Sequence, residues 1–211
     1  MKRQRHWIVL GVLYALFFGW YTSFGGPLTP AEIETLLSRI AVQSPAPSPE
    51  RLAQLRRFME EDTGDDFVMV NVIDMFDVPA QVDGVAPGDS SDKVLDRYMA
   101  YMWPALLSRA SHPVFVGSAA SDALDLMNAD DMAQWTRAAG MRYRSRRDMF
   151  EISTNAEFGD AHHFKVAAME KTIAFPIDPW MQLGDPRLVL ALLFALVGCA
   201  LSWRRAVTRQ R

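Results

Sequence analysis

Two uncharged apolar runs, one near each end of the 211-residue chain, constrain its fold more than any other feature. The first covers residues 7–24 and the second covers residues 188–203. An 18-residue helix is about 27 Å long, close to the roughly 30 Å hydrocarbon thickness of a bilayer. The sequence therefore predicts two transmembrane helices, one at each end of the chain.

Each run has an alternative interpretation that the sequence leaves open. The basic start and the apolar segment after it also fit a cleaved signal peptide, although no small-residue cleavage site follows the run. The second run is short enough for a buried core helix. Arg204 and Arg205 directly after it favour a span, because basic residues flank transmembrane helices on the cytoplasmic side.

Charge is segregated along the chain. The first six and the last eight residues carry basic side chains and no acidic ones, whereas the middle holds 15 Lys and Arg against 25 Asp and Glu. The positive-inside rule then places both termini in the cytoplasm and residues 25–186 outside it. We therefore expect a two-pass protein of the cell inner membrane, with the lipid bilayer as a partner and an extracytoplasmic, acidic domain that does not bind nucleic acid.

The order of these segments predicts five parts of the chain. They are a basic tail with the first transmembrane helix (1–25), a helical extension with a linker (26–66), an α/β domain (67–180), the second transmembrane helix (185–205) and a basic tail (206–211). In the extension, Thr29, Pro30 and Glu32 form the pattern of a helix N-terminus with a capping box. The apolar stripe of this helix is expected to pack on the α/β domain.

The middle of the chain alternates strand and helix patterns. An almost wholly apolar strand at 67–76 precedes a helix at 92–110 with Asp92 as N-cap, and strands follow at 113–120 and 135–143. A helix capped by Ser145 bends at Asn155 and continues to Lys171, and a last strand covers 172–177. The order β-α-β-β-α-β predicts an α+β, ferredoxin-like domain with helices on one face of a four-stranded sheet. The other face must also be covered, and a second sheet in a dimer would do so.

Several segments of this domain resemble a known family. FVMVNVIDMF, SHPVFVG, WTRAAGMRYRSRRD and HHFKVAAMEKTIAFP are similar to an uncharacterised bacterial family of the dimeric α/β-barrel, ferredoxin-like superfamily, over about residues 67–177. The resemblance implies a ferredoxin-like fold and a homodimer. The superfamily includes small monooxygenases, haem-degrading proteins, isomerases and chlorite-dismutase-like enzymes, but the family has no assigned activity, so the resemblance implies no particular chemistry.

Three residues are candidates for ligand binding. Asn71 is the one amide in an otherwise apolar strand, and a buried amide needs a partner. It either bonds across the sheet or contributes to a pocket in the barrel. Trp135 and Tyr143, in the third strand, are candidates for the same pocket, with core or dimer packing as the alternative role.

Two clusters of charged residues are further candidate sites. Glu157, Asp160 and His163 recur at helical spacing, but a solvated polar edge is the simpler interpretation, so we expect neither a metal nor a cofactor. The basic residues of RYRSRRD either bind an anion or pair with nearby acids. The second is favoured, since Arg144 and Asp148 are an i, i+4 pair. The side chains expected to be exposed are Arg142, Arg144, Arg146, Arg147, His162 and His163.

The sequence thus predicts a membrane-anchored protein of unassigned activity. Its extracytoplasmic α/β-barrel domain dimerises and binds a small apolar ligand. The alternative is a cofactor-independent monooxygenase-like or haem-handling enzyme that uses the barrel cavity, and the sequence does not decide whether the protein is an enzyme.

Overall fold

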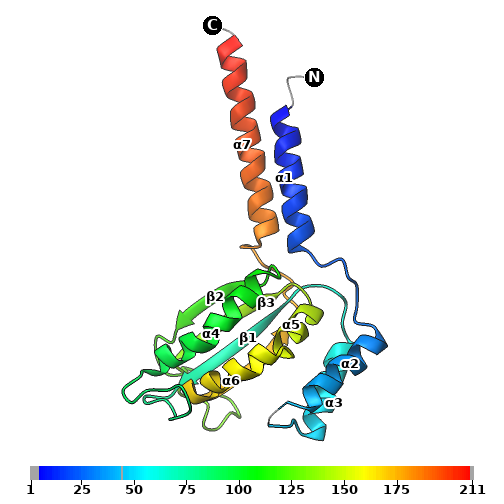
Figure 1. Ribbon diagram of the computed structural model, residues 1–211. Helices are drawn as coiled ribbons and strands as arrows, with labels where there is room; N and C mark the ends of the chain where they lie inside the picture. The colour runs from blue at the N-terminus through cyan, green and yellow to red at the C-terminus, as the bar shows by residue number, and fades with distance from the viewer. Residues whose placement is uncertain (1–4, 44, 210–211) are drawn as a thin grey trace. The chain divides into compact units, whose positions relative to one another are not determined.

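The structure, a computed structural model, describes residues 5–43 and 45–209, and it contains two compact units (Figure 1). One unit consists of Phe24–Asp178 and holds the sheet and five of the helices. The other consists of the two ends of the chain, Met1–Ser23 and Pro179–Arg211. Each unit is described by itself.

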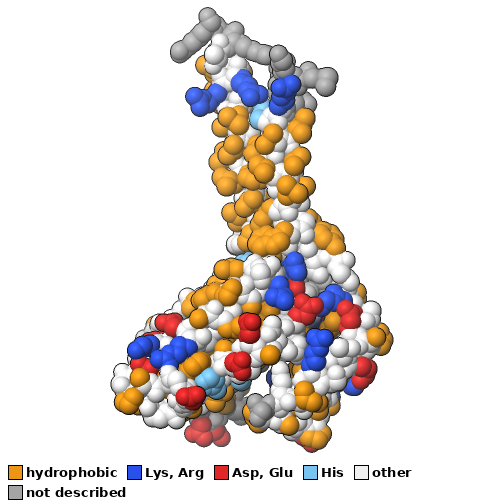
Figure 2. Space-filling model, viewed as in Figure 1, with side chains coloured by type: hydrophobic (Ala, Val, Ile, Leu, Met, Phe, Trp, Pro, Cys, Tyr) orange, Lys and Arg blue, Asp and Glu red, His pale blue; other side chains and the backbone are white. Residues whose placement is uncertain are grey.

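In the terminal unit, helices α1 (Arg5–Tyr21) and α7 (Pro186–Arg209) lie side by side (Figure 1). The indole N–H of Trp7 donates to Oγ of Ser202 at 3.3 Å. Gly198 allows this approach, because a Cβ atom there would lie 2.4 Å from the Trp7 ring. Hydrophobic side chains cover both helices and basic side chains gather at one end (Figure 2).

The described residues contain one helix that is long and apolar enough to cross a membrane, Pro186–Thr208 in α7. Helix α1 is apolar but has 17 residues. The prediction of two spanning helices is therefore supported for the second run alone. Pro186 is the first residue of α7, and the carboxylate of Asp185 before it accepts the backbone N–H of Arg187 at 2.7 Å.

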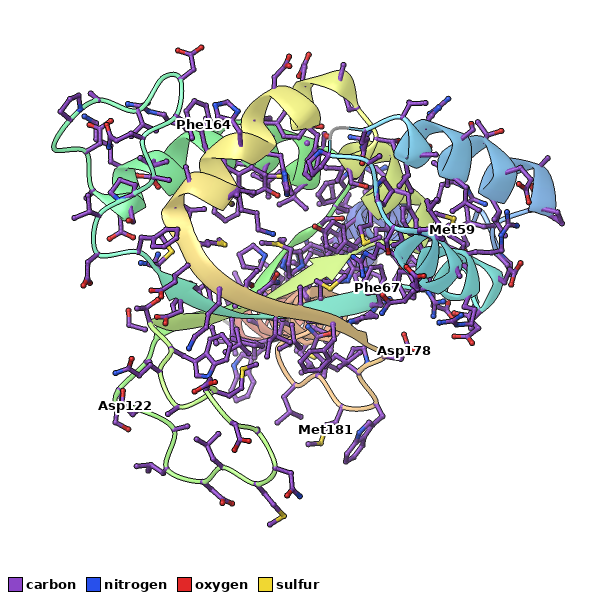
Figure 3. The ribbon with its side chains drawn as sticks, turned by 90° about the horizontal axis from the view of Figure 1, so that it is seen from below. Met59, Phe67, Asp122, Phe164, Asp178 and Met181 are labelled. Atoms are coloured by element: carbon purple, nitrogen blue, oxygen red, sulfur yellow. The ribbon has the colours of Figure 1, made fainter. Side chains whose placement is uncertain are left out.

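The other unit is built on a four-stranded antiparallel sheet in the order β2-β3-β1-β4. Its strands are β1 (Phe67–Met75), β2 (His112–Ser118), β3 (Arg137–Tyr143) and β4 (Met169–Ile177). Helices α4 (Ser91–Leu107), α5 (Arg146–Ser153) and α6 (Ala156–Ala168) lie on one side of it (Figure 3). The predicted α+β class and the β-α-β-β-α-β order are confirmed. As expected, the second connection is divided at Asn155, which caps α6.

Three element boundaries differ from the prediction. Ser90, not Asp92, is the N-cap of α4: its Oγ accepts the N–H of Lys93 at 3.2 Å, while Asp92 pairs with Arg137. Strand β3 begins at Arg137, after Trp135. Residues 169–171 belong to β4 rather than to the preceding helix, because Met169 pairs with Met75 in the sheet.

Helices α2 (Pro30–Ala41) and α3 (Pro49–Glu60) form the extension, and they pack on α5. The predicted capping box is present: the Thr29 N–H donates to Glu32 at 2.8 Å, and Thr29 Oγ1 accepts the Glu32 N–H at 3.3 Å. The expected packing is also confirmed. The buried cluster that joins these helices to α5 consists of Leu28, Ile33, Leu36, Leu37, Ile40, Met59 and Phe150.

The expectation of exposed arginines is wrong: Arg142 and Arg146 are buried, and Arg144 and Arg147 are partly buried. Arg142 is fully buried, and its Nε donates to Asp66 at 2.7 Å while its Nη1 donates to the carbonyl of Ala110 at 2.7 Å. Arg146 is buried over the ring of Phe58, 4.3 Å from its centroid. Buried guanidinium groups are tolerated because these partners satisfy them. The predicted Arg144–Asp148 pair is confirmed, with Nε 2.8 Å from the carboxylate.

We predict that Arg142→Met lowers the free energy of unfolding by about 3–5 kcal/mol, because it leaves Asp66 and the Ala110 carbonyl without their buried donor. Thermal and urea unfolding of the full chain in detergent would measure the loss. Arg51→Met is the control, since Arg51 is exposed and its guanidinium donates to the side chain of Gln54 at 2.9 Å. Equal stability of the two variants would contradict the assigned role of Arg142.

Candidate functional site

The two faces of the sheet carry different side chains. Odd-numbered residues of β1 and β3 point toward the helices, as the packing of Ile73 and Met75 against Val94 of α4 shows. Asn71 and Tyr143 share this face by alternation. The candidate site is therefore built from the helix-facing side of the sheet and the sheet-facing sides of α4 and α6.

Two tyrosines occupy this region. The ring of Tyr143 stacks on Phe67 with centroids 5.5 Å apart, and Tyr98 of α4 belongs to the same apolar cluster as Tyr143. Burial raises the pKa of Tyr143 to about 12 and raises the pKa of Tyr98 as well. Both are therefore neutral phenols at physiological pH. Neither hydroxyl bonds to another of the residues that the structure describes.

Helix α6 adds an imidazole and an amine. His162 packs against Phe158, with ring centroids 5.1 Å apart, and against Tyr98 at 6.3 Å. The Nζ of Lys165 lies 5.9 Å from the centroid of the Tyr98 ring. These residues form one stripe on α6, because positions 158, 161, 162 and 165 recur at helical spacing. His162 was expected to be exposed but is half-buried.

Burial lowers the pKa of both basic groups. Desolvation is the largest cause for His162, followed by repulsion from Lys165 and from His163. For Lys165 desolvation is the cause, and no carboxylate among the described residues forms an ion pair with it. The stripe therefore brings hydrogen-bond donors into an apolar setting without supplying negative charge.

The three predicted ligand-binding residues are not brought together. Tyr143 pairs with Phe67 at one end of the β1–β3 ladder, whereas Trp135 lies beyond the other end. The Trp135 indole donates to the carbonyl of Met132 at 2.7 Å, and its ring contacts Lys171. Asn71 lies between these ends, and its Nδ2 donates to the carbonyl of Met69 at 3.0 Å and, at 3.5 Å, to that of Ala139. The second of these bonds crosses from β1 to β3. A bond across the sheet is one of the two roles that the sequence left open for Asn71.

Sequence analysis did not single out Tyr98 or Lys165. The signal was present, because Phe158, Ala161, Lys165 and Ala168 recur with the spacing of one helix face. The contact of Lys165 with Tyr98, however, depends on how α4 and α6 meet, which one sequence does not show.

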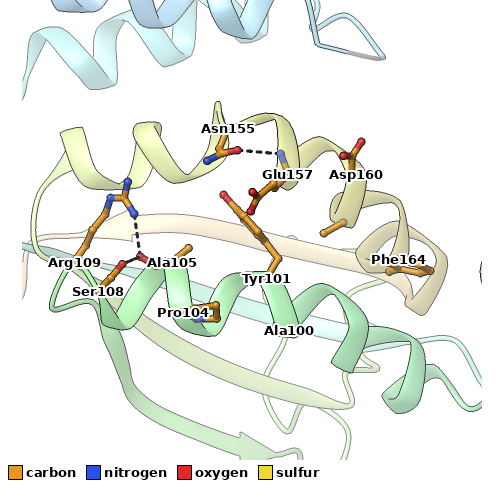
Figure 4. A pocket seen from close by; sticks show the side chains of 11 residues that line it. Ala100, Tyr101, Pro104, Ala105, Ser108, Arg109, Asn155, Glu157, Asp160 and Phe164 are labelled. Atoms are coloured by element: carbon orange, nitrogen blue, oxygen red, sulfur yellow. Dashed lines mark hydrogen bonds between the residues drawn. The ribbon is translucent and has the colours of Figure 1, made fainter.

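A groove of about 680 Å³ lies between α4 and α6, beside the α5–α6 connection (Figure 4). Several of its polar side chains are already engaged. The Tyr101 hydroxyl donates to the carbonyl of Ile152 at 2.9 Å, Arg109 donates to Ala105 at 3.3 Å, and Asn155 accepts the N–H of Glu157 at 3.0 Å. The groove therefore offers a ligand fewer uncommitted donors than the region around Lys165.

The acidic residues of the predicted polar edge line this groove, but His163 does not. Glu157 and Asp160 are lining residues, whereas Nε2 of His163 lies 3.3 Å from the carbonyl of Asp83. Among residues 5–43 and 45–209, no cluster of three His, Cys, Asp or Glu side chains is arranged to hold a metal ion.

The face of the sheet away from the helices is apolar and partly open. Phe115, Ile173, Phe175 and Ile177 are between 39% and 48% exposed. Phe115 lies across Gly140, where a Cβ atom would approach its ring to 2.3 Å. The loop that carries Asp122 emerges on this side, opposite Phe164 of α6 (Figure 3).

Comparison with protein-family models gives no match, and comparison with curated proteins gives none either. Among solved structures, a protein of unknown function from Rhodopseudomonas palustris is similar at 19% identity and a TM-score of 0.51, over 64% of this chain and 95% of that one. Two others have lower TM-scores. A dimeric protein of unknown function and ferredoxin-like fold from Bacteroides fragilis is 15% identical at 0.32, over 54% of this chain and 96% of that one. A cofactor-independent oxygenase from Streptomyces nogalater is 11% identical at 0.36, over 57% of this chain and 99% of that one. Only the first likeness bears on this chain, and it supports the fold alone.

We predict that the free energy of unfolding falls as the pH drops below about 6.5, the ordinary pKa of histidine. Below that pH the imidazole of His162 binds a proton in the unfolded chain but not in the folded one, because its pKa is lowered in the folded state. The effect is absent above that pH, where His162 is neutral in both states. Between pH 7 and pH 5, the thermal midpoint of the full chain should fall less in His162→Gln than in the wild type. His6→Gln, on α1, is the matched control, and an unchanged decline in His162→Gln would contradict the prediction.

Proposed function

We propose that the chain is a two-pass inner-membrane protein whose extracytoplasmic α/β domain forms a homodimer and holds a small apolar ligand between its sheet and helices. The proposal divides the chain as the sequence suggests, into an extension at 26–66, a domain at 67–180 and a spanning helix at each end. The observation that carries it is the apolar sheet face opposite the helices.

A sheet with helices on one side must cover its other side as well. Here that side presents Phe115, Ile173, Phe175 and Ile177 to solvent. Two such faces packed against each other, about 10 Å apart, would let the aromatic side chains interdigitate. Within the Phe24–Asp178 unit, none of the described helices lies across this face (Figure 3), so a second copy of the sheet would match its polarity.

The helix side supports the ligand part of the proposal. Small-molecule sites combine apolar walls with a few convergent polar groups. The described region holds Met141 and Phe158 as apolar groups beside Tyr98 and Tyr143, whose hydroxyls are polar. Asn71 borders the same face of the sheet.

The terminal helices support the membrane part. Helix α7 has the length and composition of a span, and α1 lies beside it through the Trp7–Ser202 bond. Basic residues gather at the end of this pair that carries both termini, among them Arg5 and Arg205 (Figure 2). Under the positive-inside rule, this end is the cytoplasmic one.

The alternative function, a monooxygenase-like or haem-handling enzyme, would use the same region between sheet and helices. No observation on the described residues favours turnover over binding. Binding is therefore the function proposed.

We predict that Phe175→Asp converts the dimer to a monomer, because it places a charge within the apolar sheet face. Native mass spectrometry of the detergent-solubilised chain would give the mass. Val78→Asp is the control, since Val78 is 75% exposed in the loop after β1 and should leave the dimer intact. A wild-type monomer, or a Phe175→Asp dimer, would contradict the proposal.

We also predict the topology by cysteine labelling in a Cys199→Ala background, since Cys199 is the only cysteine. A membrane-impermeant maleimide should label Ser121→Cys in intact spheroplasts, because this loop residue lies outside the cytoplasm. Gln4→Cys and Thr208→Cys should react only after permeabilisation. Labelling of either terminus in intact spheroplasts would refute the two-pass arrangement.

A further inference from the structure

The short segment before α7, residues 179–184, exposes three large apolar side chains. Trp180 is 93% exposed, Leu183 is 78% exposed and Met181 is 66% exposed. The segment carries no charged residue, and we call it the pre-span loop. Single exposed apolar residues are normal on a protein surface, whereas a contiguous group of them marks an interaction surface. The proposed function assigns no partner to this loop.

We propose that the pre-span loop docks into the interfacial layer of the bilayer, among the lipid headgroups and the upper acyl chains. This inference rests on the proposed membrane-spanning role of α7. It deepens that role by adding a lipid-binding surface outside the helix, at the end of α7 opposite the basic tail.

The length of α7 sets the depth of the loop. The stretch Pro186–Thr208 has 23 residues and is about 35 Å long, which exceeds the roughly 30 Å hydrocarbon layer. The start of the helix therefore reaches the interface. Directly before it, the N–H of Asp185 donates to the carbonyl of Gln182 at 3.2 Å and closes a turn. Leu183 lies in this turn, so it is held beside the first residues of the helix.

The charges at the start of α7 balance each other. Nη2 of Arg187 lies 2.5 Å from the carboxylate of Asp185, and its guanidinium carbon lies 5.5 Å from the centroid of the Tyr21 ring. The carbonyl of Arg187 accepts the hydroxyl of Tyr14 at 3.1 Å. These contacts join the start of α7 to α1 and bring no net charge to the headgroup layer. The surface therefore suits zwitterionic lipid, because anionic lipid is selected by clusters of basic residues.

The residue types of the surface match the interface. Tryptophan is enriched at membrane–water interfaces, because its ring is apolar while its N–H donates a hydrogen bond. Trp180 supplies one such ring, and Met181 and Leu183 supply hydrocarbon beside it. Trp20, in the last turn of α1, is 49% exposed and adds a second indole within the terminal unit.

A second copy of the chain is the other candidate occupant of this surface. The connection to α7 favours lipid. Trp180 is six positions before Pro186, so even a fully extended chain keeps it within about 20 Å of the start of the span. Tethered groups meet their partner at a high effective concentration. The bilayer surface is therefore always within reach of the loop, whereas a second copy first has to associate.

The test follows a fluorescent NBD group on Met181→Cys, in the Cys199→Ala background, with the full chain in phosphatidylcholine nanodiscs. A lipid that carries a nitroxide near its headgroup should quench the group more strongly than one with the nitroxide near the end of its acyl chain. The emission should also shift to shorter wavelength when the detergent-solubilised chain enters nanodiscs. Leu196→Cys, within α7, should give the opposite order of quenching.

Matched variants show whether the loop itself places the probe. Trp180→Ser combined with Leu183→Ser removes two exposed apolar side chains beside the probe and should weaken its quenching by the headgroup nitroxide. Leu124→Ser combined with Met127→Ser is the control, since these side chains are 94% and 78% exposed in the loop between β2 and β3. The control pair should leave the quenching unchanged.

The outcomes separate this inference from the proposed function. If lipid nitroxides quench the probe at position 196 but not the one at position 181, the docking is overturned and the span stands. A probe at position 181 that is shielded from aqueous iodide without quenching by lipid would show a protein partner instead, which also overturns it. So would quenching that persists in Trp180→Ser/Leu183→Ser. If the probe at position 196 escapes lipid quenching, the spanning role of α7 falls, and this inference with it.

Discussion

The buried guanidinium of Arg142 is the interaction on which the α/β domain depends. It joins three separate parts of the chain: the residue before β1 through Asp66, the end of α4 through Ala110, and β3 itself. Ala110 adopts a positive φ of 51° and the neighbouring Ser111 is fully buried, so this corner has little freedom. Because arginine remains charged in proteins, all three parts must be in place before its burial is tolerated.

The residues after Arg142 form further contacts, some of them with helices α2 and α3 of the extension. Arg144 is held by Asp148, Arg146 donates to the carbonyl of Phe58 in α3, and Arg147 pairs with Glu32 at 2.9 Å. A segment that looks like a basic binding motif is therefore a set of internal connections. On α6, by contrast, Lys165 lies over the ring of Tyr98 and forms no ion pair with a described carboxylate. The domain thus uses its arginines for architecture and keeps one lysine uncommitted.

The sequence predicted the features that depend on local chemistry. Strand β1 follows from its run of Val and Ile, and the caps at Thr29 and Ser145 follow from side chains that accept backbone N–H groups. The cap of α4 was misplaced because Ser90 and Asp92 are both competent caps. Met169 was assigned to a helix because its neighbours favour helix, and its pairing with Met75 overrides that preference.

The candidate site could not be predicted in the same way. Whether an arginine or a lysine is buried depends on which carboxylates and carbonyls, from segments distant in the sequence, bind its side chain. Asp66 and Arg142 are 76 positions apart, and nothing in either local pattern points to the other. Likewise, Tyr98 and Lys165 meet only because α4 and α6 lie together on one face of the sheet. Asn71 and Tyr143 lie on the same face of the sheet, but their distance along the strands depends on the strand register, which the sequence does not show.

The contact between Trp7 and Gly198 has a mechanical consequence for the terminal helices. The indole occupies the space that any side chain at position 198 would need, so the ring packs directly against the backbone of α7 at Gly198. Sliding either helix by one turn, about 5.4 Å, would set the indole against a bulkier position. The pair consequently has one preferred axial alignment, which an indole and a glycine define.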